Sequence, residues 1–368
     1  MAGFPFMRQA EAFRSSLPFI LLLAVFILPC PMSAAAKPRP AIAFVHLLLP
    51  PGGEPHASPA GWIGSLDRAR DTLESLRIPT IVSSASPRNA EDLNELSEMD
   101  PEVLITTSPL LYAAACDVAK RSPNTVFFAC TDETVHDNMS GFQARTYEAH
   151  YLAGLIAGAL SEDGVIGYLA NDPYQSKASR LRNANAFTLG AQKSKAAIRV
   201  LYAPGNDPDE ELKTLIAAGA DIVDLERALP SLVERLREHS VRYVGTAGRT
   251  VDPLCLAAPE WEWSNAFGDL LTQVRFGIWR PRNVSYGIKE GVVGLSPFGP
   301  AVPETVRVRV REAKEAIRNG ASPFEGPVRD VSGSLRIAEG SVPDDATLRG
   351  MDWRVQGLEP LPLTPDGL

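Results

Sequence analysis

Beyond Pro40 the chain alternates between two patterns of apolar and polar residues. Short apolar runs rich in β-branched and aromatic residues are typical of strands buried on both faces, whereas apolar residues recurring every three or four positions are typical of helices. Their alternation predicts βαβ units, in which helices cover both faces of a parallel sheet. The predicted strands are Ala41–Val45, Thr80–Ser83, Val103–Thr106, Val126–Ala129, Val165–Tyr168, Arg199–Tyr202, Ile222–Asp224 and Arg242–Gly245.

Between these strands lie segments with helical periodicity. They are Ser65–Leu76, Pro109–Lys120, Tyr147–Leu160, Ser179–Lys193, Pro208–Ala218 and Leu229–Glu238, followed later in the chain by Ser264–Phe276 and Pro303–Asn319.

The length of 368 residues favours two domains, because a single hydrophobic core seldom grows beyond about 250–300 residues. The small residues in Arg145–Gly158 permit a close helix contact, and this segment separates two sets of strands. We therefore expect an α/β fold with two doubly wound parallel-sheet lobes. The expected boundaries are 37–146 plus about 251–285 for the first lobe, 147–250 plus about 286–320 for the second, and 321–368 for a C-terminal wrap.

The amino end has the pattern of a secretory signal. Arg8 and Arg14 precede the apolar run Leu17–Leu28, and the small residues Ser33 to Ala36 follow it. Twelve apolar residues fall short of the roughly 20 that span a bilayer, so we expect residues 1–36 to be cleaved and the mature protein to be periplasmic. Lipid attachment at Cys30 is the alternative, which the preceding Pro29 disfavours.

Net charge and cysteine content narrow the possible partners. The formal net charge is −8 and no run of five Lys or Arg occurs, so we expect no binding to nucleic acid. After cleavage Cys116, Cys130 and Cys255 remain, an odd number without metal-ligand spacing. Buried thiols are the expected state, with a Cys116–Cys130 disulfide as the alternative.

Signatures of catalysis are missing from the sequence. It has no G-x-S-x-G elbow, phosphate-binding P-loop or H-E-x-x-H motif, and its five histidines form no pair spaced for a metal on one helix face. Glu260 and Glu262 flank Trp261 and have the composition of an acid–base pair, but a ligand-facing tryptophan between solvated carboxylates is the simpler reading. We expect no catalytic residues, no metal and no cofactor.

Three segments resemble one family of binding proteins. They are Glu148–Gly158 (EAHYLAGLIAG), Gly164–Tyr168 (GVIGY) and Asn185–Ala191 (NAFTLGA), supported by Gly61-Trp62, Trp261-x-Trp263 and Met351-x-Trp353. The chain resembles the basic membrane protein family of ABC-transporter substrate-binding proteins, to which the purine-nucleoside receptors belong. The resemblance spans nearly the whole mature chain.

This resemblance implies the type I periplasmic binding protein fold, with two lobes joined by three crossovers and a ligand between them. The carboxyl ends of parallel strands in both lobes would then meet at one crevice. Carried over from the family, the expected ligand contacts are Trp62 as an aromatic platform, Asp132 after the fourth strand, and Asn185 and Phe187 from the second lobe.

Other candidate ligand contacts come from positions where this chain departs from the family. Relatives usually carry a polar or acidic element after the seventh strand and Gly-x-Asp after the eighth, where this chain has Glu226 and Arg249. We add these two residues and Trp261 to the candidates. An aromatic ring with carboxylate and amide groups suits a planar heterocycle, which favours a purine base or nucleoside, whereas Arg249 suits an anionic or carbonyl-bearing ligand.

The expected function is therefore uptake of a small molecule. A monomeric binding protein closes on its ligand and docks on an ABC permease in the inner membrane. A ligand sensor for a membrane receptor is the alternative, because both functions use the same closure. A nucleoside-processing enzyme is the third possibility.

The first prediction concerns export. The mature protein should begin near Lys37, because cleavage after the small residues Ala34 to Ala36 fits the charged and apolar segments before them. Intact-mass spectrometry of the exported protein measures this start. Recovery of residues 1–36 on the membrane-bound protein would contradict it.

Overall fold

The computed structural model describes residues 40–47, 61–85, 91–131, 133, 136–172, 175–245 and 252–362. All eight predicted strands are confirmed, with ends that shift by at most two residues. The predicted helices are confirmed as well, except that 109–120 divides into a 3-10 turn, η1 (Pro109–Leu111), and α3 (Tyr112–Ala119). Residues 1–36, the predicted signal peptide, and Cys30 within them lie outside the described residues, so these predictions stay untested.

The first sheet has six parallel strands in the order β12-β5-β4-β3-β1-β2. Because β1 lies between β2 and β3, the strand order reverses at β1 and β3, as in doubly wound sheets. The strands are β1 (Ile42–Leu47), β2 (Thr80–Ala85), β3 (Val103–Thr106), β4 (Val126–Cys130), β5 (Met139–Ala144) and β12 (Asn283–Tyr286).

The second sheet repeats this plan in the order β10-β9-β8-β6-β7-β16, again with parallel neighbours. Here the reversal lies at β6 and β8. The strands are β6 (Val165–Leu169), β7 (Arg199–Ala203), β8 (Ile222–Leu225), β9 (Arg242–Gly245), β10 (Cys255–Ala257) and β16 (Leu358–Pro360).

The chain crosses between the sheets three times: after β5, between β10 and β12, and between β12 and β16. The expected α/β fold of two doubly wound sheets with three crossovers is therefore confirmed. The antiparallel pair β11 (Pro259–Trp261) and β13 (Val293–Leu295) flanks β12 in the chain. The lobe boundaries stay a prediction, although β10, from the 251–285 range assigned to the first lobe, pairs with β9 of the second sheet.

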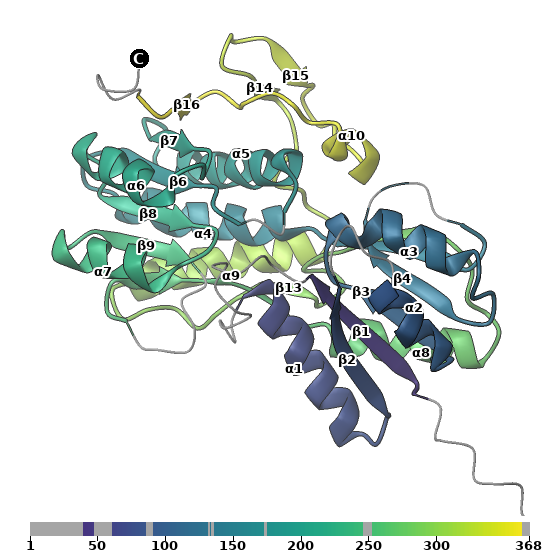
Figure 1. Cartoon of the computed structure of the whole chain (residues 1–368). Helices are drawn as coiled ribbons and strands as arrows, with labels where there is room; N and C mark the ends of the chain where they lie inside the picture. The colour runs from purple at the N-terminus through teal and green to yellow at the C-terminus, as the bar shows by residue number, and fades with distance from the viewer. Residues whose placement is uncertain are drawn as a thin grey trace, which may run out of the picture. The chain divides into compact units, whose positions relative to one another are not determined.

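Helices cover both faces of each sheet, because neighbouring strand residues point to opposite sides. In the first sheet, Ile42 and Phe44 lie on the face that packs against α1 (Trp62–Ser75) and α8 (Ser264–Arg275). Ala43 and Val45 lie on the opposite face, which packs against α2 (Glu91–Glu98) and α3. In the second sheet, one face packs on α4 (Thr146–Leu160) and α5 (Lys177–Ser194), and the other packs on α6 (Pro208–Ala217) and α7 (Pro230–Glu238) (Figure 1).

Helices α4 and α5 pack against each other at glycines, as the small residues of Arg145–Gly158 predicted. A Cβ at Gly154 would overlap the carbonyl oxygen of Phe187, and one at Gly190 would overlap that of Tyr151. Gly158 meets Ala191 in the same way. Only a hydrogen at these positions lets the two backbones approach so closely.

After α9 (Glu304–Arg318), the final segment runs along the second sheet and α5. It contains β14 (Val328–Arg329), β15 (Leu335–Ile337) and α10 (Asp345–Arg349) before β16 joins the edge of the sheet (Figure 1). Arg145, just before α4, forms a bidentate ion pair with Asp345 at 2.9 and 2.8 Å, which ties α10 to the end of the first sheet.

The second prediction tests the glycine contact. Gly154→Ala should lower the free energy of unfolding by about 1–3 kcal/mol, because the methyl group must displace a backbone carbonyl in a filled core. Gly268→Ala is the matched control, since Gly268 lies in α8 and a Cβ there meets nothing within 4 Å. The control should leave stability unchanged or raise it by up to about 1 kcal/mol. Urea unfolding measures both, and equal midpoints for the two variants would contradict the prediction.

Candidate ligand-binding site

Trp62 lies at the carboxyl end of the first sheet. The sequence predicted a helix beginning at Ser65, but α1 begins at Trp62. Its indole Nε1 donates a hydrogen bond to the carbonyl oxygen of Thr107 over 2.8 Å. Thr107 directly follows β3, one of the two strands at which the order reverses, the position where open α/β sheets bind ligands. Three other rings hold the half-buried indole: Trp261 and Trp263 edge-on at 5.7 and 5.3 Å, and Phe142 nearly parallel at 6.5 Å.

A pocket beside Trp62 is bounded by residues associated with both sheets. Its lining from the first sheet and its loops comprises Trp62, Pro109, Cys130, Gln143, Ala144 and Thr146 at the start of α4, and the opposite lining comprises Gln175, Ser176 and Ser179 at the start of α5. Among these described residues none carries a carboxylate, ammonium or guanidinium group. The pocket therefore combines one aromatic face with neutral hydrogen-bonding groups.

Glu226 directly follows β8, one of the two strands at which the order of the second sheet reverses, just as Thr107 follows β3 in the first sheet. Its Oε1 accepts hydrogen bonds from the Tyr168 hydroxyl at 2.8 Å and from Asn183 Nδ2 at 3.3 Å. Burial raises the pKa of Glu226 to about 7. The structure thus places this predicted ligand contact in a buried network behind the pocket lining, where it positions other polar groups.

A second buried ionisable pair lies next to this network. His150 of α4 and Asp224 of β8 meet at 2.9 Å between Nδ1 and Oδ2, with 2% and 0% of their side chains exposed. Burial by itself would lower the pKa of His150, but the Asp224 carboxylate reverses this effect and the pKa is raised. This buried pair joins α4 to β8 and gives His150 a structural role.

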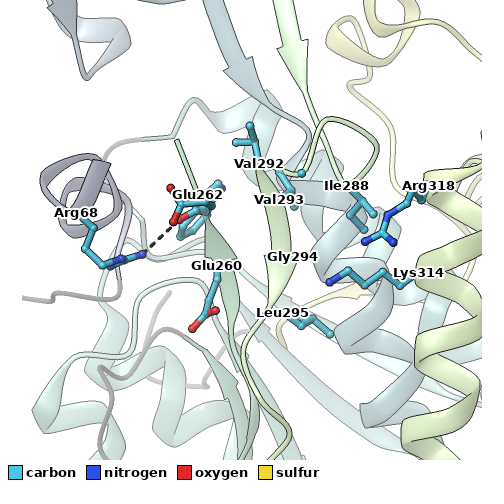
Figure 2. Close-up of a pocket in the computed structure, with 12 residues that line it drawn as sticks. Arg68, Glu260, Glu262, Ile288, Val292, Val293, Gly294, Leu295, Lys314 and Arg318 are labelled. Carbon is cyan, nitrogen blue, oxygen red and sulfur yellow. Dashed lines mark hydrogen bonds between the residues drawn. The ribbon is translucent and has the colours of Figure 1, made fainter. Parts of the chain in front are cut away.

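Trp261 lines a different and larger cavity, of about 340 Å³. Figure 2 shows this cavity beside β11 and β13, with Arg68 on one side and Lys314 and Arg318 of α9 on the other. Glu260 and Glu262 also line it. The carbonyl oxygen of Trp261 accepts a hydrogen bond from Arg68 at 3.3 Å, while its indole Nε1 lies 3.2 Å from Thr146 Oγ1. Trp261 therefore supports Trp62 and Thr146 from behind the candidate site.

Asn185 and Phe187 both lie in the core between α5 and its neighbours. The Asn185 amide uses both ends: Nδ2 donates to the carbonyl oxygen of Trp353 at 2.8 Å, and Oδ1 accepts from the Val355 amide at 3.0 Å. Phe187 is fully buried, with its ring 5.5 Å from Tyr168. Neither residue lines the pocket beside Trp62.

The remaining candidates for ligand contacts, Asp132 and Arg249, lie outside the described residues, so their roles stay predictions.

Within the described part of the chain, no group of three His, Cys, Asp or Glu side chains is placed to hold a metal ion. None of the described helices is both long and apolar enough to cross a membrane. No disulfide joins Cys116 to Cys130.

Comparison with known proteins agrees with this architecture. Residues 65–217 match the family model described as ABC transporter substrate-binding protein PnrA-like. The resemblance to this family is confirmed. A Brucella abortus protein named as a purine-binding protein is 28% identical over 346 residues, covering 89% of this chain and 95% of its own.

Two further matches extend the comparison. A Haloferax volcanii protein named as a putative ABC transporter glucose-binding protein is 28% identical over 310 residues, covering 77% of this chain and 78% of its own. The solved structure of an ABC transporter solute-binding protein from Conexibacter woesei superposes with a TM-score of 0.60 at 17% identity, covering 76% of this chain and 97% of its own. At that identity it supports the fold alone. These relatives are solute-binding proteins, and this chain resembles a class of binders and not of enzymes.

Two pocket residues, Gln143 and Gln175, were missed by the sequence analysis. Gln143 belongs to β5, whose sequence MSGFQA has no continuous apolar run and was not predicted as a strand. Gln175 precedes a helix that was predicted to begin at Ser179 but begins at Lys177. A recognisable signal was the serine at 176, which accepts a hydrogen bond from the Ser179 amide as a helix N-cap.

The third prediction separates structural from ligand-contacting roles. Asn185→Ala should cost about 1–3 kcal/mol of stability, because it leaves the buried Trp353 carbonyl and Val355 amide without their partner. Affinity for any ligand of the pocket should change less than about twofold, since the Asn185 side chain faces the final segment. Thermal unfolding and titration calorimetry measure the two effects. Asn319→Ala, at an exposed position after α9, is the control and should stay within about 0.5 kcal/mol of the parent.

A large loss of affinity in Asn185→Ala without loss of stability would restore Asn185 to the ligand contacts.

Proposed function

We propose that the protein is an exported substrate-binding protein of an ABC uptake transporter, and that it binds a purine base or nucleoside in the pocket beside Trp62. One observation carries the proposal: a tryptophan at the reversal of the first sheet faces a pocket whose described lining is uncharged and includes two amide side chains. The ligand chemistry follows from these groups.

A planar ligand gains from the indole. Trp62 is anchored by its hydrogen bond to Thr107 and by the surrounding rings, so little side-chain freedom is lost when a base stacks on it. Gln143 supplies an amide that can donate or accept a hydrogen bond, and Gln175 supplies an N–H donor, which match the ring nitrogens and exocyclic groups of a purine.

The absence of charge in the described lining favours a neutral ligand. A nucleotide would bring a phosphate group into a pocket where no described lining residue offers a cation. A base or nucleoside brings no such charge, so its desolvation is less costly. The proposed ligand class is therefore purine bases and nucleosides, not nucleotides.

Ligand binding also requires the pocket to change size. Its volume is about 70 Å³, below the roughly 300–1,000 Å³ of typical small-molecule sites. Folds with two sheets joined by crossovers admit and enclose ligands by hinge motion. We propose that the two sheets separate to admit the ligand, close around it, and present the closed form to the permease.

The names of the relatives define the competing ligands. Purine binding is named for the Brucella abortus protein, and glucose binding, as putative, for the Haloferax volcanii protein. A sugar also suits an aromatic face beside a described lining without charge, so sugars belong in the same experiment.

The fourth prediction is measured by titration calorimetry with adenine, guanine, adenosine, adenosine monophosphate and glucose. A base or nucleoside should bind, and the monophosphate should bind at least about tenfold more weakly than its nucleoside. Trp62→Ala should weaken purine binding by about ten- to a hundredfold, which corresponds to loss of a stacking contact of about 1–3 kcal/mol.

Trp62→Phe is the matched control, because phenylalanine keeps an aromatic face and part of the packing while losing the hydrogen bond to Thr107. Its affinity should lie between those of the parent and Trp62→Ala. Binding of glucose but none of the purines would exclude the proposed ligand class. Recovery of a chemically altered ligand after incubation would favour an enzyme over a transporter component.

A further inference from the structure

The side chain of Gln175 is held in one orientation. Its Oε1 accepts two hydrogen bonds, from Ser179 Oγ at 2.9 Å and from Asn183 Nδ2 at 2.9 Å. Because a carbonyl oxygen has two lone pairs, this end of the amide is fully used. Gln175 therefore cannot turn its oxygen toward the pocket without breaking both bonds.

Asn183 connects Gln175 to the buried network around Glu226 through hydrogen bonds. Its Nδ2 carries two hydrogens, one directed to Gln175 Oε1 and the other to Glu226 Oε1 at 3.3 Å. Glu226 Oε1 accepts from both Asn183 and the Tyr168 hydroxyl, so Asn183 must turn its NH₂ group, and not its oxygen, toward Glu226. The second hydrogen of that group is then donated to Gln175 Oε1. A buried carboxylate thus sets which end of a pocket amide is exposed.

The exposed end of Gln175 is a donor. Its Nε2 gives one hydrogen to Asp172 Oδ2 at 3.2 Å, and no described residue accepts the second. Gln175 lies in the pocket lining beside the first turn of α5, an 18-residue helix whose amino end carries partial positive charge. The two features act in the same direction, so this wall of the pocket attracts hydrogen-bond acceptors.

The opposite wall is adaptable. The Gln143 amide enters none of the side-chain hydrogen bonds among the described residues and is free to present either its oxygen or its nitrogen. The two glutamines therefore differ in role: one is a fixed donor and the other adjusts to the ligand.

We propose that Gln175 is a specificity-determining hydrogen-bond donor, with Ser179 and Asn183 as its positioning residues, and that the pocket selects ligands presenting a carbonyl oxygen or an unprotonated ring nitrogen to α5. This inference rests on the proposed function in taking the pocket as the ligand site. It adds which edge of the ligand faces the second sheet and which hydrogen-bonding groups that edge must carry.

The fifth prediction pairs residue variants with ligand variants. Adenine and its 1-deaza, 3-deaza and 7-deaza analogues differ by one ring acceptor each while keeping their shape. One of the three analogues should bind the parent protein about three- to tenfold more weakly than adenine does, because it lacks the acceptor that meets Gln175. In Gln175→Met, which keeps the side-chain length but has no donor, that particular penalty should disappear.

Gln175→Glu replaces the donor with an acceptor and should weaken adenine binding by at least about tenfold. Gln143→Met is the matched control on the opposite wall and should leave the Gln175-dependent penalty in place. If all three deaza penalties are the same in the parent and in Gln175→Met, the inference is overturned.

A measurement on the ligand-free protein tests the orientation separately. In ¹⁵N-glutamine-labelled protein, relaxation of the side-chain amides should show Gln175 restrained and Gln143 mobile, and Ser179→Ala should release Gln175 in part. Equal mobility of the two amides in the parent protein would overturn the inference whatever the ligand is. Failure of all purines to bind, with Gln175 still restrained, would instead count against the proposed function.

Discussion

The close contact between α4 and α5 is the constraint on which the other features of the molecule depend. Gly154, Gly158 and Gly190 leave no room for a Cβ, so the two helices meet backbone to backbone. A single residue, Arg145, separates the end of β5 from the start of α4, while α5 begins beside the pocket. One hydrophobic core accordingly runs from the α1 and α8 face of the first sheet, across α4, to the second sheet. The register of these helices sets where the two walls of the pocket lie.

Charge is distributed unevenly around this contact. His150, Asp224 and Glu226 are buried behind the pocket, while the described lining is neutral. Buried ionisable groups are tolerated only with partners, and each of these has one: His150 pairs with Asp224, and Tyr168 donates to Glu226. Glu226 influences the pocket lining through hydrogen bonds, because Asn183 donates one hydrogen to Glu226 and the other to Gln175 and so orients the Gln175 amide. A pocket whose described lining carries no charge therefore has a defined polarity.

The final segment explains why residues with family-like patterns need not touch a ligand. Asn185 binds the backbone at Trp353 and Val355, and Arg182 donates to the Leu348 carbonyl at 3.1 Å. Arg145 and Asp345 join the same segment to the end of the first sheet, and the arginine lowers the pKa of that carboxyl. The Asn-x-Phe pattern of α5 and the tail around Trp353 thus belong to one packing unit.

The fold could be predicted from the order of residues, because buried parallel strands and amphipathic helices have different periods of apolar residues. Both periods can be recognised without knowing which elements pack together. The sequence also indicated the glycine-rich contact of α4 and the resemblance to the binding-protein family. It could not show the strand β5, where a Cβ on Gly141 would lie only 2.7 Å from the Thr131 carbonyl oxygen. Nor could it show the tail strands, whose short runs have no period of their own.

The side chains that surround the candidate pocket could not be identified before the packing of the two sheets was known. Trp62, Gln143 and Gln175 come from segments far apart in the chain, and their proximity depends on the order of strands in two sheets and on the three crossovers. Residue type alone could not separate Gln175 in the pocket lining from Asn185 in the core, since both are amides at or near the same helix. What separates them is the set of hydrogen-bond partners that folding brings to each, which no local sequence pattern records.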